Sequence, residues 1–385
     1  MLALSFYAAA MSCQPEELRR RLALAARTRG LDAAAFAALA AEDPGLELLE
    51  RPEPAALTRL GMAAEAIRGL ACPDEARIAA DLQWLSNSGS QLLPCFSDAY
   101  PPLLRESPDA PPLLYVRGRV DVLREPQLAM VGSRNPSAGG RATARQFAAS
   151  FARLGLTITI GLALGIDAAC HEGALGAEGT TIAVLGHGLD DIYPREHEAL
   201  AERVAAAGAL ISEFPPGTPP LNHHFPRRNR IIAGLAHGTL VVEAAAKSGS
   251  LITARLAGVA GREVFAIPGS IHNEMARGCH QLIRQGAKLV ECPEDVLAEL
   301  KISLCTQLLV VPGTGPGTPR PAGSVLDKEY KILLDALAFE PASVDSLIER
   351  TGMNSESIAS MLLILELDGH VAPHPGGRYS RMAGH

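Results

Sequence analysis

Short apolar runs recur between residues 127 and 290, and most of them lead through a glycine-bearing turn into a segment of helical composition. Continuous apolar runs rich in β-branched residues are typical of strands buried on both faces of a parallel sheet, with helices as the crossovers. The predicted strands are Leu128–Val131, Leu156–Ile160, Thr181–Leu185, Ala209–Ser212, Thr239–Val242, Glu263–Ile267 and Lys288–Val290. This alternation predicts a doubly wound, mostly parallel α/β sheet.

The segment before these runs has a different pattern. Ile78, Leu82 and Leu85 recur at the spacing of one helix face, and short helix-forming stretches broken by turns precede them. We therefore predict a small helical bundle over residues 1–95. The stretch 100–116 is rich in proline, so we expect it to be an extended lead-in without helix.

The segment after the apolar runs begins with a linker. Proline and glycine supply eight of the thirteen residues 311–323, a composition that cannot bury a core. Beyond it, helical spacing predicts three helices, the third through Ile358 and Leu365, and Gly376-Gly377 predicts a hairpin turn. Three helices and a hairpin in this order are typical of a winged helix. The predicted division is 1–95 helical bundle, 96–300 α/β domain, 301–324 linker and 325–385 winged helix.

Composition narrows the class of protein. Hydrophobic residues make up 48% and charged residues 20% of the 385 residues, which excludes global disorder. No apolar run reaches the roughly 18 residues of a membrane-spanning helix, so we expect a soluble protein with no membrane span. The seven cysteines form no CxxC pair, which argues against a zinc site and favours the reducing cytoplasm. The apolar opening lacks a basic region, so Met11 is favoured as the true start over a signal peptide.

The formal net charge of −7 argues against a protein that coats DNA through a generally basic surface. Residues 1–123 carry 12 Lys and Arg against 16 Asp and Glu, whereas residues 124–300 carry 16 against 17. The arginines of this less acidic middle part are bunched, as in Arg227, Arg228 and Arg230. A polyanion, if one is bound, is expected at the middle part.

Two glycine-bearing turns follow the first two predicted strands. The first, Gly132 to Gly140, opens a helix, and helix starts favour phosphate, but it matches neither GxGxxG nor a Walker motif. A tight turn that binds nothing is the alternative. The second turn contains Gly161, Gly165 and Asp167, and lies beside the first across the sheet. Asp167 either orients a ligand or simply caps the helix that follows.

The segment from His223 to Ile232 is the most basic one. Arg228, Asn229 and Arg230, preceded by Phe225, offer a phosphate clamp with a platform for base stacking. The alternative is a solvated basic helix start with Phe225 in the core. A metal at the adjacent histidines is disfavoured, because no Asp, Glu or Cys ligand accompanies them at useful spacing.

A further helix start, Ser248-Gly249-Ser250 with Lys247 before it, follows the strand that ends near Glu243. Its hydroxyl and N–H groups are expected on the same rim as the first two turns. In contrast, the predicted third helix of the winged helix, residues 354–368, contains no Lys or Arg. A DNA-reading helix needs cations for the phosphates, so a protein-contact role is favoured there over DNA reading.

Taken together, these segments resemble the DNA-processing protein A family, DprA, also called Smf. The resemblance extends without a gap from about residue 100 to residue 300. The motifs that carry it are VGSRNPS, GLALGIDAACH, TIAVLGHGLDDIYPREH, ISEFPPGTPP, HFPRRNRIIAGL, VVEAAAKSGSLITARLA, GREVFAIPGS and RGCHQLI. It implies an extended Rossmann-like domain flanked by an N-terminal helical (SAM-like) domain and a C-terminal winged helix.

The resemblance also implies a function. Members are non-enzymatic proteins without a cofactor that bind single-stranded DNA, protect incoming DNA during natural transformation and load the RecA recombinase onto it. They form homodimers through the Rossmann-like domain, here toward the Gly261–Leu300 half. The candidate DNA-binding residues are Gly132, Ser133, Arg134, Gly161, Gly165, Phe225, Arg228, Asn229, Arg230, Lys247, Ser248, Gly249 and Ser250.

Four positions depart from the family pattern. Ile160 and Leu164 stand where most members have Ser and Arg, so two polar groups are missing from the second turn. His187 and His197 replace the usual Ser and Asn. The direct contact of the second turn with phosphate is therefore the least supported part of the predicted site.

Two other function classes compete with a DNA-binding scaffold. A related Rossmann-like group hydrolyses nucleotide N-glycosidic bonds with a Glu and an Arg near a phosphate turn, and Glu243 beside Ser248–Ser250 resembles that arrangement. Those hydrolases have a Pro-Gly-Gly loop before the glutamate, whereas this chain has Leu235-Ala-His-Gly238. A pure protein adaptor would leave the bunched arginines unexplained. The single-stranded-DNA binder is the leading hypothesis.

Overall fold

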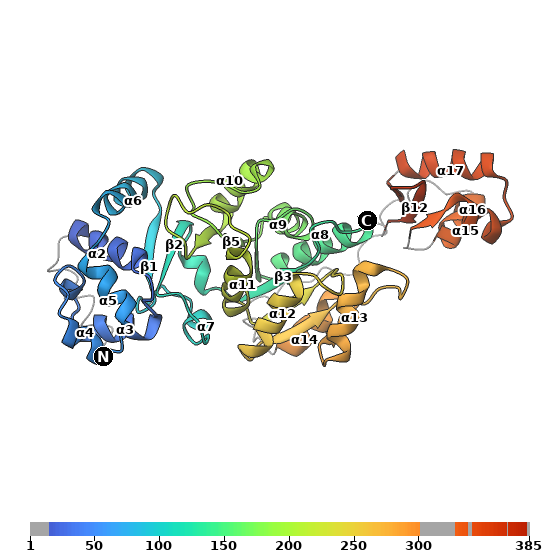
Figure 1. Cartoon of the computed structure of the whole chain (residues 1–385). Coiled ribbons are helices and arrows are strands. Elements are labelled where there is room, and N and C mark those ends of the chain that lie inside the picture. Colours follow the sequence, from blue (N-terminus) through green and yellow to red (C-terminus); the bar gives the residue numbers. More distant parts are fainter. Residues whose placement is uncertain (1–14, 301–327, 338–340, 368, 383–385) are drawn as a thin grey trace, which may run out of the picture.

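The computed structural model describes residues 15–300, 328–337, 341–367 and 369–382 (Figure 1). A mixed sheet of nine strands lies at its centre, in the order β1-β2-β6-β5-β4-β3-β7-β8-β9. The strands are β1 (Gln91–Pro94), β2 (Leu113–Gly118), β3 (Gln127–Val131), β4 (Thr157–Ile160), β5 (Thr181–Val184), β6 (Ala209–Ser212), β7 (Gly238–Val241), β8 (Glu263–Ala266) and β9 (Lys288–Leu289). All neighbours from β6 to β9 pair in parallel, which confirms the predicted doubly wound, mostly parallel sheet.

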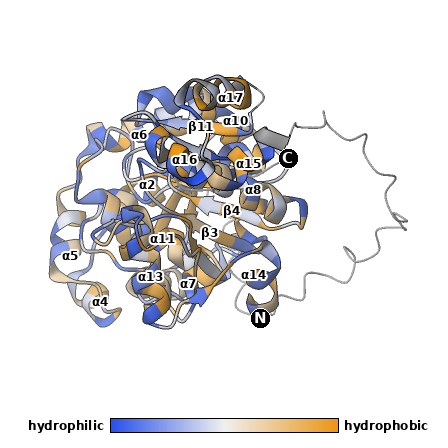
Figure 2. Ribbon diagram, turned by 90° about the vertical axis from the view of Figure 1, so that its right-hand side faces the viewer, coloured by the Kyte–Doolittle hydropathy of each residue, from blue (hydrophilic) through white to orange (hydrophobic). Residues whose placement is uncertain are grey.

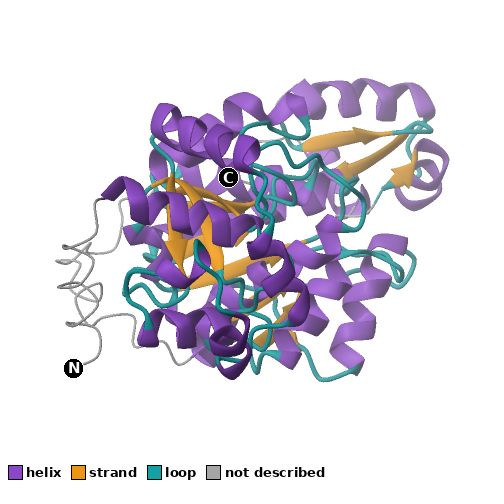
Figure 3. Cartoon of the chain, turned by 60° about the vertical axis from the view of Figure 1, so that its left-hand side comes forward, coloured by secondary structure: helices purple, strands orange, loops and turns teal. Residues whose placement is uncertain are grey.

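Helices cover both faces of the sheet because successive strand residues point to opposite sides. The helices are α8 (Ala138–Arg153), α9 (Ile166–Gly176), α10 (Glu198–Ala207), α11 (His224–Leu235), α12 (Ser250–Val259), α13 (Arg277–Arg284) and α14 (Pro293–Leu300). Leu128 and Met130 of β3 belong to the core under α8, α9 and α14, whereas Ala129 and Val131 belong to the core under α11, α12 and α13. Figure 3 shows the strands enclosed by helices on both sides.

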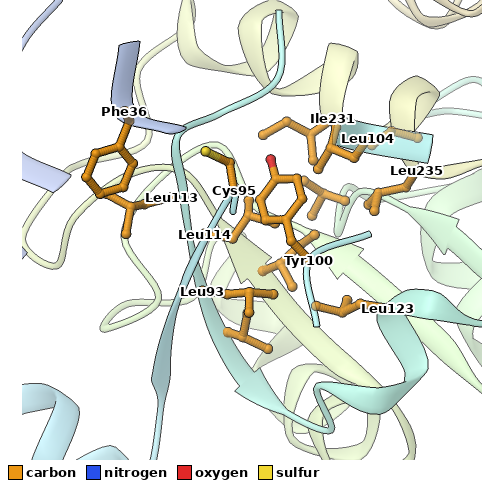
Figure 4. Packing of buried hydrophobic residues seen from close by; sticks show 14 of the residues in the cluster. Phe36, Leu93, Cys95, Tyr100, Leu104, Leu113, Leu114, Leu123, Ile231 and Leu235 are labelled. Carbon is orange, nitrogen blue, oxygen red and sulfur yellow. The ribbon is translucent and has the colours of Figure 1, made fainter. Parts of the chain in front are cut away.

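The N-terminal helices form the predicted bundle and share a core with the sheet. Their bounds are α2 (Pro15–Arg27), α3 (Ala33–Glu42), α4 (Pro54–Arg59), α5 (Ala64–Ala71) and α6 (Glu75–Ser88). Fully buried Phe36 of α3 lies beside Leu113 of β2 in one continuous cluster with Tyr100 and Ile231 (Figure 4). Because this cluster crosses from bundle to sheet, it fixes the bundle against the sheet.

The prediction that residues 100–116 contain no helix is wrong. α7 (Pro102–Arg105) is a short helix with proline at its first position, where the missing N–H has no partner within the helix. β2 follows and pairs antiparallel with β6 on one side and with β1 on the other. The extended lead-in thus contains one strand, β2, and the stretch predicted as the helical bundle, residues 1–95, ends in another strand, β1.

The C-terminal residues form the predicted winged helix. Its elements are α15 (Lys328–Leu337), β10 (Ala342–Ser343), α16 (Val344–Thr351), α17 (Ser355–Leu367), β11 (Val371–His374) and β12 (Arg378–Arg381). Ser380 and Arg381 line a hollow together with Ser137 and Glu243, so the hairpin lies near the start of α8.

Hydropathy agrees with this arrangement. In Figure 2 helices such as α4, α5 and α13 carry both hydrophilic and hydrophobic residues, as expected of helices with one face on a core. No helix in the described ranges is long and apolar enough to cross a membrane. The Met11 start and the 301–324 linker lie outside the described residues, and the division of the chain into four parts stays a prediction.

Candidate nucleic-acid interface

The loops that follow the parallel strands meet at the carboxyl edge of the sheet, where doubly wound folds bind ligands. A pocket at this edge lies over the ends of β4 and β5. The side chains and backbone that line it come from three loops and from the first turn of α11. They include Arg134, Leu162, Leu164, Val184, Gly186, His187, Tyr193, Phe225 and Arg228. The structure therefore brings together three of the predicted DNA-binding side chains, those of Arg134, Phe225 and Arg228. The predicted glycines Gly161 and Gly165 lie in the loops beside them.

Aromatic rings form one wall of this pocket. Phe225 is half-buried, and the exposed Tyr193 ring lies with its centroid 6.2 Å from that of Phe225 at an angle of 40°. The guanidinium carbon of Arg134 lies 5.5 Å from the Phe225 ring centroid, within cation–π range. An open aromatic face beside an exposed cation can stack a base and contact its phosphate.

Arg228 supplies a cation from inside the pocket. Its side chain is buried, and its Nη1 donates a hydrogen bond to the carbonyl oxygen of Val184. Its Nε has no hydrogen-bond partner, and no carboxylate forms an ion pair with it in the described part of the chain. Burial lowers the pKa of Arg228 to about 10, so the guanidinium is charged at neutral pH. A buried, unpaired cation with unused N–H donors favours an anionic ligand.

Gly161 is the position that lets Arg228 and Asp167 approach each other. A Cβ atom at residue 161 would lie 2.5 Å from Arg228 Nη1 and 2.5 Å from Asp167 Oδ2. Asp167 Oδ2 accepts a hydrogen bond from the Ala163 N–H at 3.2 Å, and burial raises the pKa of this carboxyl group to about 6. The alternative that Asp167 caps α9 is wrong, because the N-cap residue is Gly165 and it makes no side-chain cap bond.

The first and second loops pack directly on each other. Gly165 has a φ of +86°, and a Cβ there would lie 2.5 Å from the carbonyl oxygens of Ser133 and Arg134. The Ile166 N–H donates to the Ser133 carbonyl oxygen at 3.1 Å, and Ile166 also fills the space beside Gly132. Gly132, Ser133 and Gly165 therefore act by positioning Arg134 at the rim of the pocket.

The start of α8, predicted to favour phosphate, is occupied by a carboxylate of the protein itself. Glu243 Oε2 accepts a hydrogen bond from the Ser137 N–H at 2.9 Å, and Oε1 accepts one from the Ser137 hydroxyl at 2.6 Å. Ser137 Oγ in turn accepts from the Gly140 N–H at 2.9 Å. The carboxylate thus complements the helix dipole, and the N–H groups of Ser137 and Gly140 are already bonded.

The arginines in the basic segment of α11 lie on two different surfaces. Arg227 and Arg230 both bind the buried carboxylate of Glu213, at 2.9 and 2.6 Å, and Arg230 also pairs with Asp109 at 2.9 Å. Among the arginines of this segment, Arg228 is the one that lines the pocket. Asn229 is partly buried.

The fourth predicted element lies apart from the pocket. Lys247, Ser248 and Gly249 line a different hollow, between α12 and α13, with Arg255. Ser250 is buried, and its hydroxyl lies 2.7 Å from that of Ser248. The predicted turns therefore do not share one rim. They line two separate hollows at the carboxyl edge of the sheet.

The four residues that depart from the family pattern lie in or around the pocket and the core beneath it. Ile160 is fully buried in the core under α8 and α9, whereas Leu164 is 46% exposed and lines the pocket. His187 is buried beside the pocket with Nδ1 2.9 Å from the Gly188 carbonyl oxygen, and burial lowers its pKa. His197 lies with Nδ1 2.9 Å from the Leu162 carbonyl oxygen and so supports the second loop.

Sequence reasoning missed Tyr193. The signal that could have found it is an aromatic residue in the loop after a predicted strand, at the edge where ligands bind.

The adjacent histidines His223 and His224 do not belong to a metal-binding cluster in the structure. The described residues contain no group of three or more His, Cys, Asp or Glu side chains placed to hold a metal ion. His224 instead stacks on Phe214.

Comparison with known proteins adds a family context to this geometry. The sequence model described as DNA recombination-mediator protein A matches residues 91–301, and the DprA winged helix domain matches residues 317–377. Protein Smf of Escherichia coli K12 is 46% identical over 301 residues, which is 78% of this chain and 80% of that protein.

Two solved structures are similar in fold. The X-ray structure of DNA processing protein A from Streptococcus pneumoniae has a TM-score of 0.64 at 37% identity, covering 73% of this chain and 97% of that one. A DNA processing protein A structure from Helicobacter pylori, described for its single-stranded DNA binding mode, has a TM-score of 0.51 at 27% identity and covers 56% and 97%.

Proposed function

The chain belongs to the DNA-processing protein A (DprA/Smf) family, and from this premise we propose that it is a non-enzymatic, cytoplasmic protein that binds single-stranded DNA. The observation that carries the proposal is the pocket in which buried, unpaired Arg228 faces the aromatic wall of Phe225 and the exposed Arg134. Stacking and phosphate contacts carry little base information, so binding is expected to depend weakly on sequence.

A gel-shift comparison tests this proposal. Single-stranded oligonucleotides should bind more tightly than duplexes of equal length, because bases paired in a duplex are not free to stack on Phe225. Equal affinity for both forms would overturn the stacking pocket.

Arg134 is expected to contribute one phosphate contact. Arg134→Ala should weaken single-strand binding and lower the slope of log affinity against log salt by about 0.7, since each contact on a single strand releases that share of a counterion. Fluorescence anisotropy across a salt series measures the slope. An unchanged slope would place Arg134 outside the DNA path.

Asp167 gives the binding a pH dependence. Its folded-state pKa of about 6 lies above the ordinary value of 3.8, so the group gains its proton between pH 7 and pH 5 and the pocket gains one unit of positive charge. The same shift makes folding stability rise as pH falls through 6. Single-strand affinity should increase about threefold or more from pH 7.5 to pH 5. Asp167→Asn should show a smaller increase than the wild type, because the other titratable groups, among them His187 of the pocket, are present in both proteins. Equal increases in the two proteins, or none in the wild type, would contradict the role of Asp167.

Glu243 tests the enzyme alternative. Because the Glu243 carboxylate is bonded to Ser137 at the start of α8, we propose that its role is structural and that this protein is not an N-glycosidic hydrolase. Glu243→Gln should lower the free energy of unfolding by about 1–3 kcal/mol, measured in urea, with single-strand affinity within twofold of wild type. Wild-type protein incubated with nucleoside monophosphates should release no base; release would favour the hydrolase.

Three finer parts of the function follow from the family membership. We propose that the protein protects incoming DNA in natural transformation, loads the RecA recombinase and forms a homodimer. For the dimer, β9 ends one side of the sheet and Leu289 is 47% exposed there, although Val290 beside it is buried in the core. Light scattering at micromolar concentration should give about twice 40.5 kDa. A monomer that still binds DNA would refute the dimer.

A further inference from the structure

A second hollow opens at the same carboxyl edge, between the N-terminal bundle and the loop after β6. It lies next to the pocket along the sheet, because β6 is the neighbour of β5. Its walls come from the end of α2, from α5 and α6, from Glu213–Pro215 and from His223 and His224 at the start of α11. Phe225, the next residue along the chain, lines the pocket, so the two hollows meet at the start of this helix.

Arginines line this hollow even though the N-terminal part of the chain is acidic. They are Arg27, Arg29, Arg68, Arg77 and Arg227. Three of them are engaged, Arg27 with Asp81 at 2.6 Å, Arg77 with Asp74 at 3.2 Å and Arg227 with Glu213 at 2.9 Å.

Two of these arginines are available to a ligand. Arg29 and Arg68 are exposed and form no ion pair with another described residue. Of the three carboxylates that line the hollow, Asp74 and Glu213 pair with Arg77 and Arg227, and Glu65 forms no ion pair with a described residue. Two available cations against one carboxylate favour an anionic ligand at this surface.

Stacked rings line the same hollow. The His224 ring lies on Phe214 with centroids 4.3 Å apart and an angle of 25°, and the exposed His223 ring contacts His224 edge-on at 4.5 Å. The Arg227 guanidinium lies 5.5 Å from the Phe214 centroid. Flat rings and guanidinium planes next to free cations are the surface that a single strand uses for its bases and phosphates.

Both walls of the hollow are rigid. The bundle and the sheet share the core that contains Phe36 and Leu113 (Figure 4), and Arg27 also donates a hydrogen bond to the carbonyl oxygen of Pro216 at 2.9 Å. The cations on the bundle are therefore held at a fixed place relative to the pocket, as a preformed binding surface requires.

We propose that this hollow continues the DNA path: a single strand whose base occupies the Phe225 pocket crosses the start of α11 and enters the hollow. There Arg29 and Arg68 hold its phosphates, and His223 offers a ring to its bases. The proposal rests on the proposed function, which it extends from one pocket to a groove that includes the N-terminal bundle.

Oligonucleotide length separates the two surfaces. The double variant Arg29→Ala/Arg68→Ala should bind a strand of about six thymidines as wild type does, because such a strand fills the pocket alone. It should bind a strand of about twenty thymidines roughly tenfold more weakly, with a salt slope lowered by about 1.4 for two lost phosphate contacts. Anisotropy measures both, and a thermal melt confirms that the variant is folded.

A matched control removes the same charge from the same bundle. Arg51 and Arg59 are exposed and do not line the hollow, so Arg51→Ala/Arg59→Ala should bind both strands as wild type does. A folded Arg29→Ala/Arg68→Ala protein with wild-type affinity for the long strand would overturn the inference, as would an equal loss in both double variants. Failure of the wild type to bind even the long strand would instead overturn the proposed function.

Discussion

Replacing Arg228 with Met is expected to lower single-strand affinity by about 10- to 100-fold with little loss of stability. A hydrogen bond to a charged group contributes about 1.5–3 kcal/mol, and each 1.4 kcal/mol is a factor of ten. The loss of stability is small because Arg228 forms no direct ion pair in the described structure and its Nε is unbonded, and because the buried Asp167 nearby, whose pKa is raised to about 6, can take up a proton when the cation is removed. Substituting a buried charge by an apolar side chain of similar volume is often neutral or stabilising.

Arg230→Met is the matched control, two residues along the same helix. Arg230 pairs with Glu213 and Asp109 outside the pocket, so its removal leaves the buried Glu213 carboxylate with one cation fewer. We expect this variant to lose stability, seen as a lower urea midpoint, and to keep its affinity for a short strand within about threefold. The opposite result, in which Arg230→Met loses affinity and Arg228→Met does not, would show that the clamp predicted from the sequence uses the other arginine.

The contrast between these two arginines shows where sequence reasoning ends. Residues 227, 228 and 230 are close in sequence, but successive helix residues point about 100° apart, so they reach different surfaces. Which one faces the pocket depends on Glu213, a carboxylate in the loop after β6 that binds the other two. The sequence could place the cations at the right edge of the sheet, whereas their partners are set by tertiary packing.

Glu243 and Ser137 illustrate the same limit over a longer range. A helix start favours an anion, and the sequence predicted phosphate at the start of α8, whereas the group bound there is a carboxylate of the protein itself. The anion is a side chain 106 residues away in sequence, brought to α8 because β7 pairs with β3. No local pattern reveals such a partner.

For the fold, the parallel strands were predictable because burial on both faces makes them continuously apolar. β1 and β2 were not, since β1 is only partly buried and a proline-rich stretch lies between the two strands. Proline was read there as excluding a helix, but at the first helical position it is well tolerated.

Phe225→Ala is the other substitution with a large expected effect. Stacking of a base on an aromatic ring contributes about 1–3 kcal/mol, so single-strand affinity should fall by about 5- to 100-fold. The ring also lies 5.5 Å from the Arg134 guanidinium carbon and 6.2 Å from the Tyr193 ring, so its removal takes away contacts that hold both side chains at the rim. Duplex affinity, which depends on phosphates, should change by less than threefold.

Two further variants separate stacking from packing at residue 225. Phe225→Trp keeps an aromatic face and should retain affinity within about threefold of wild type, whereas Phe225→Leu keeps apolar volume without that face and should bind as weakly as Phe225→Ala. Gly186 borders this ring, since a Cβ there would lie 3.2 Å from Phe225 Cδ1, so the absence of a side chain at residue 186 is what admits an aromatic ring at this place. Anisotropy with one short strand and its duplex measures all three. Wild-type affinity in Phe225→Leu would mean that residue 225 only fills space, and the preference for single strands would then have to arise from the cations alone.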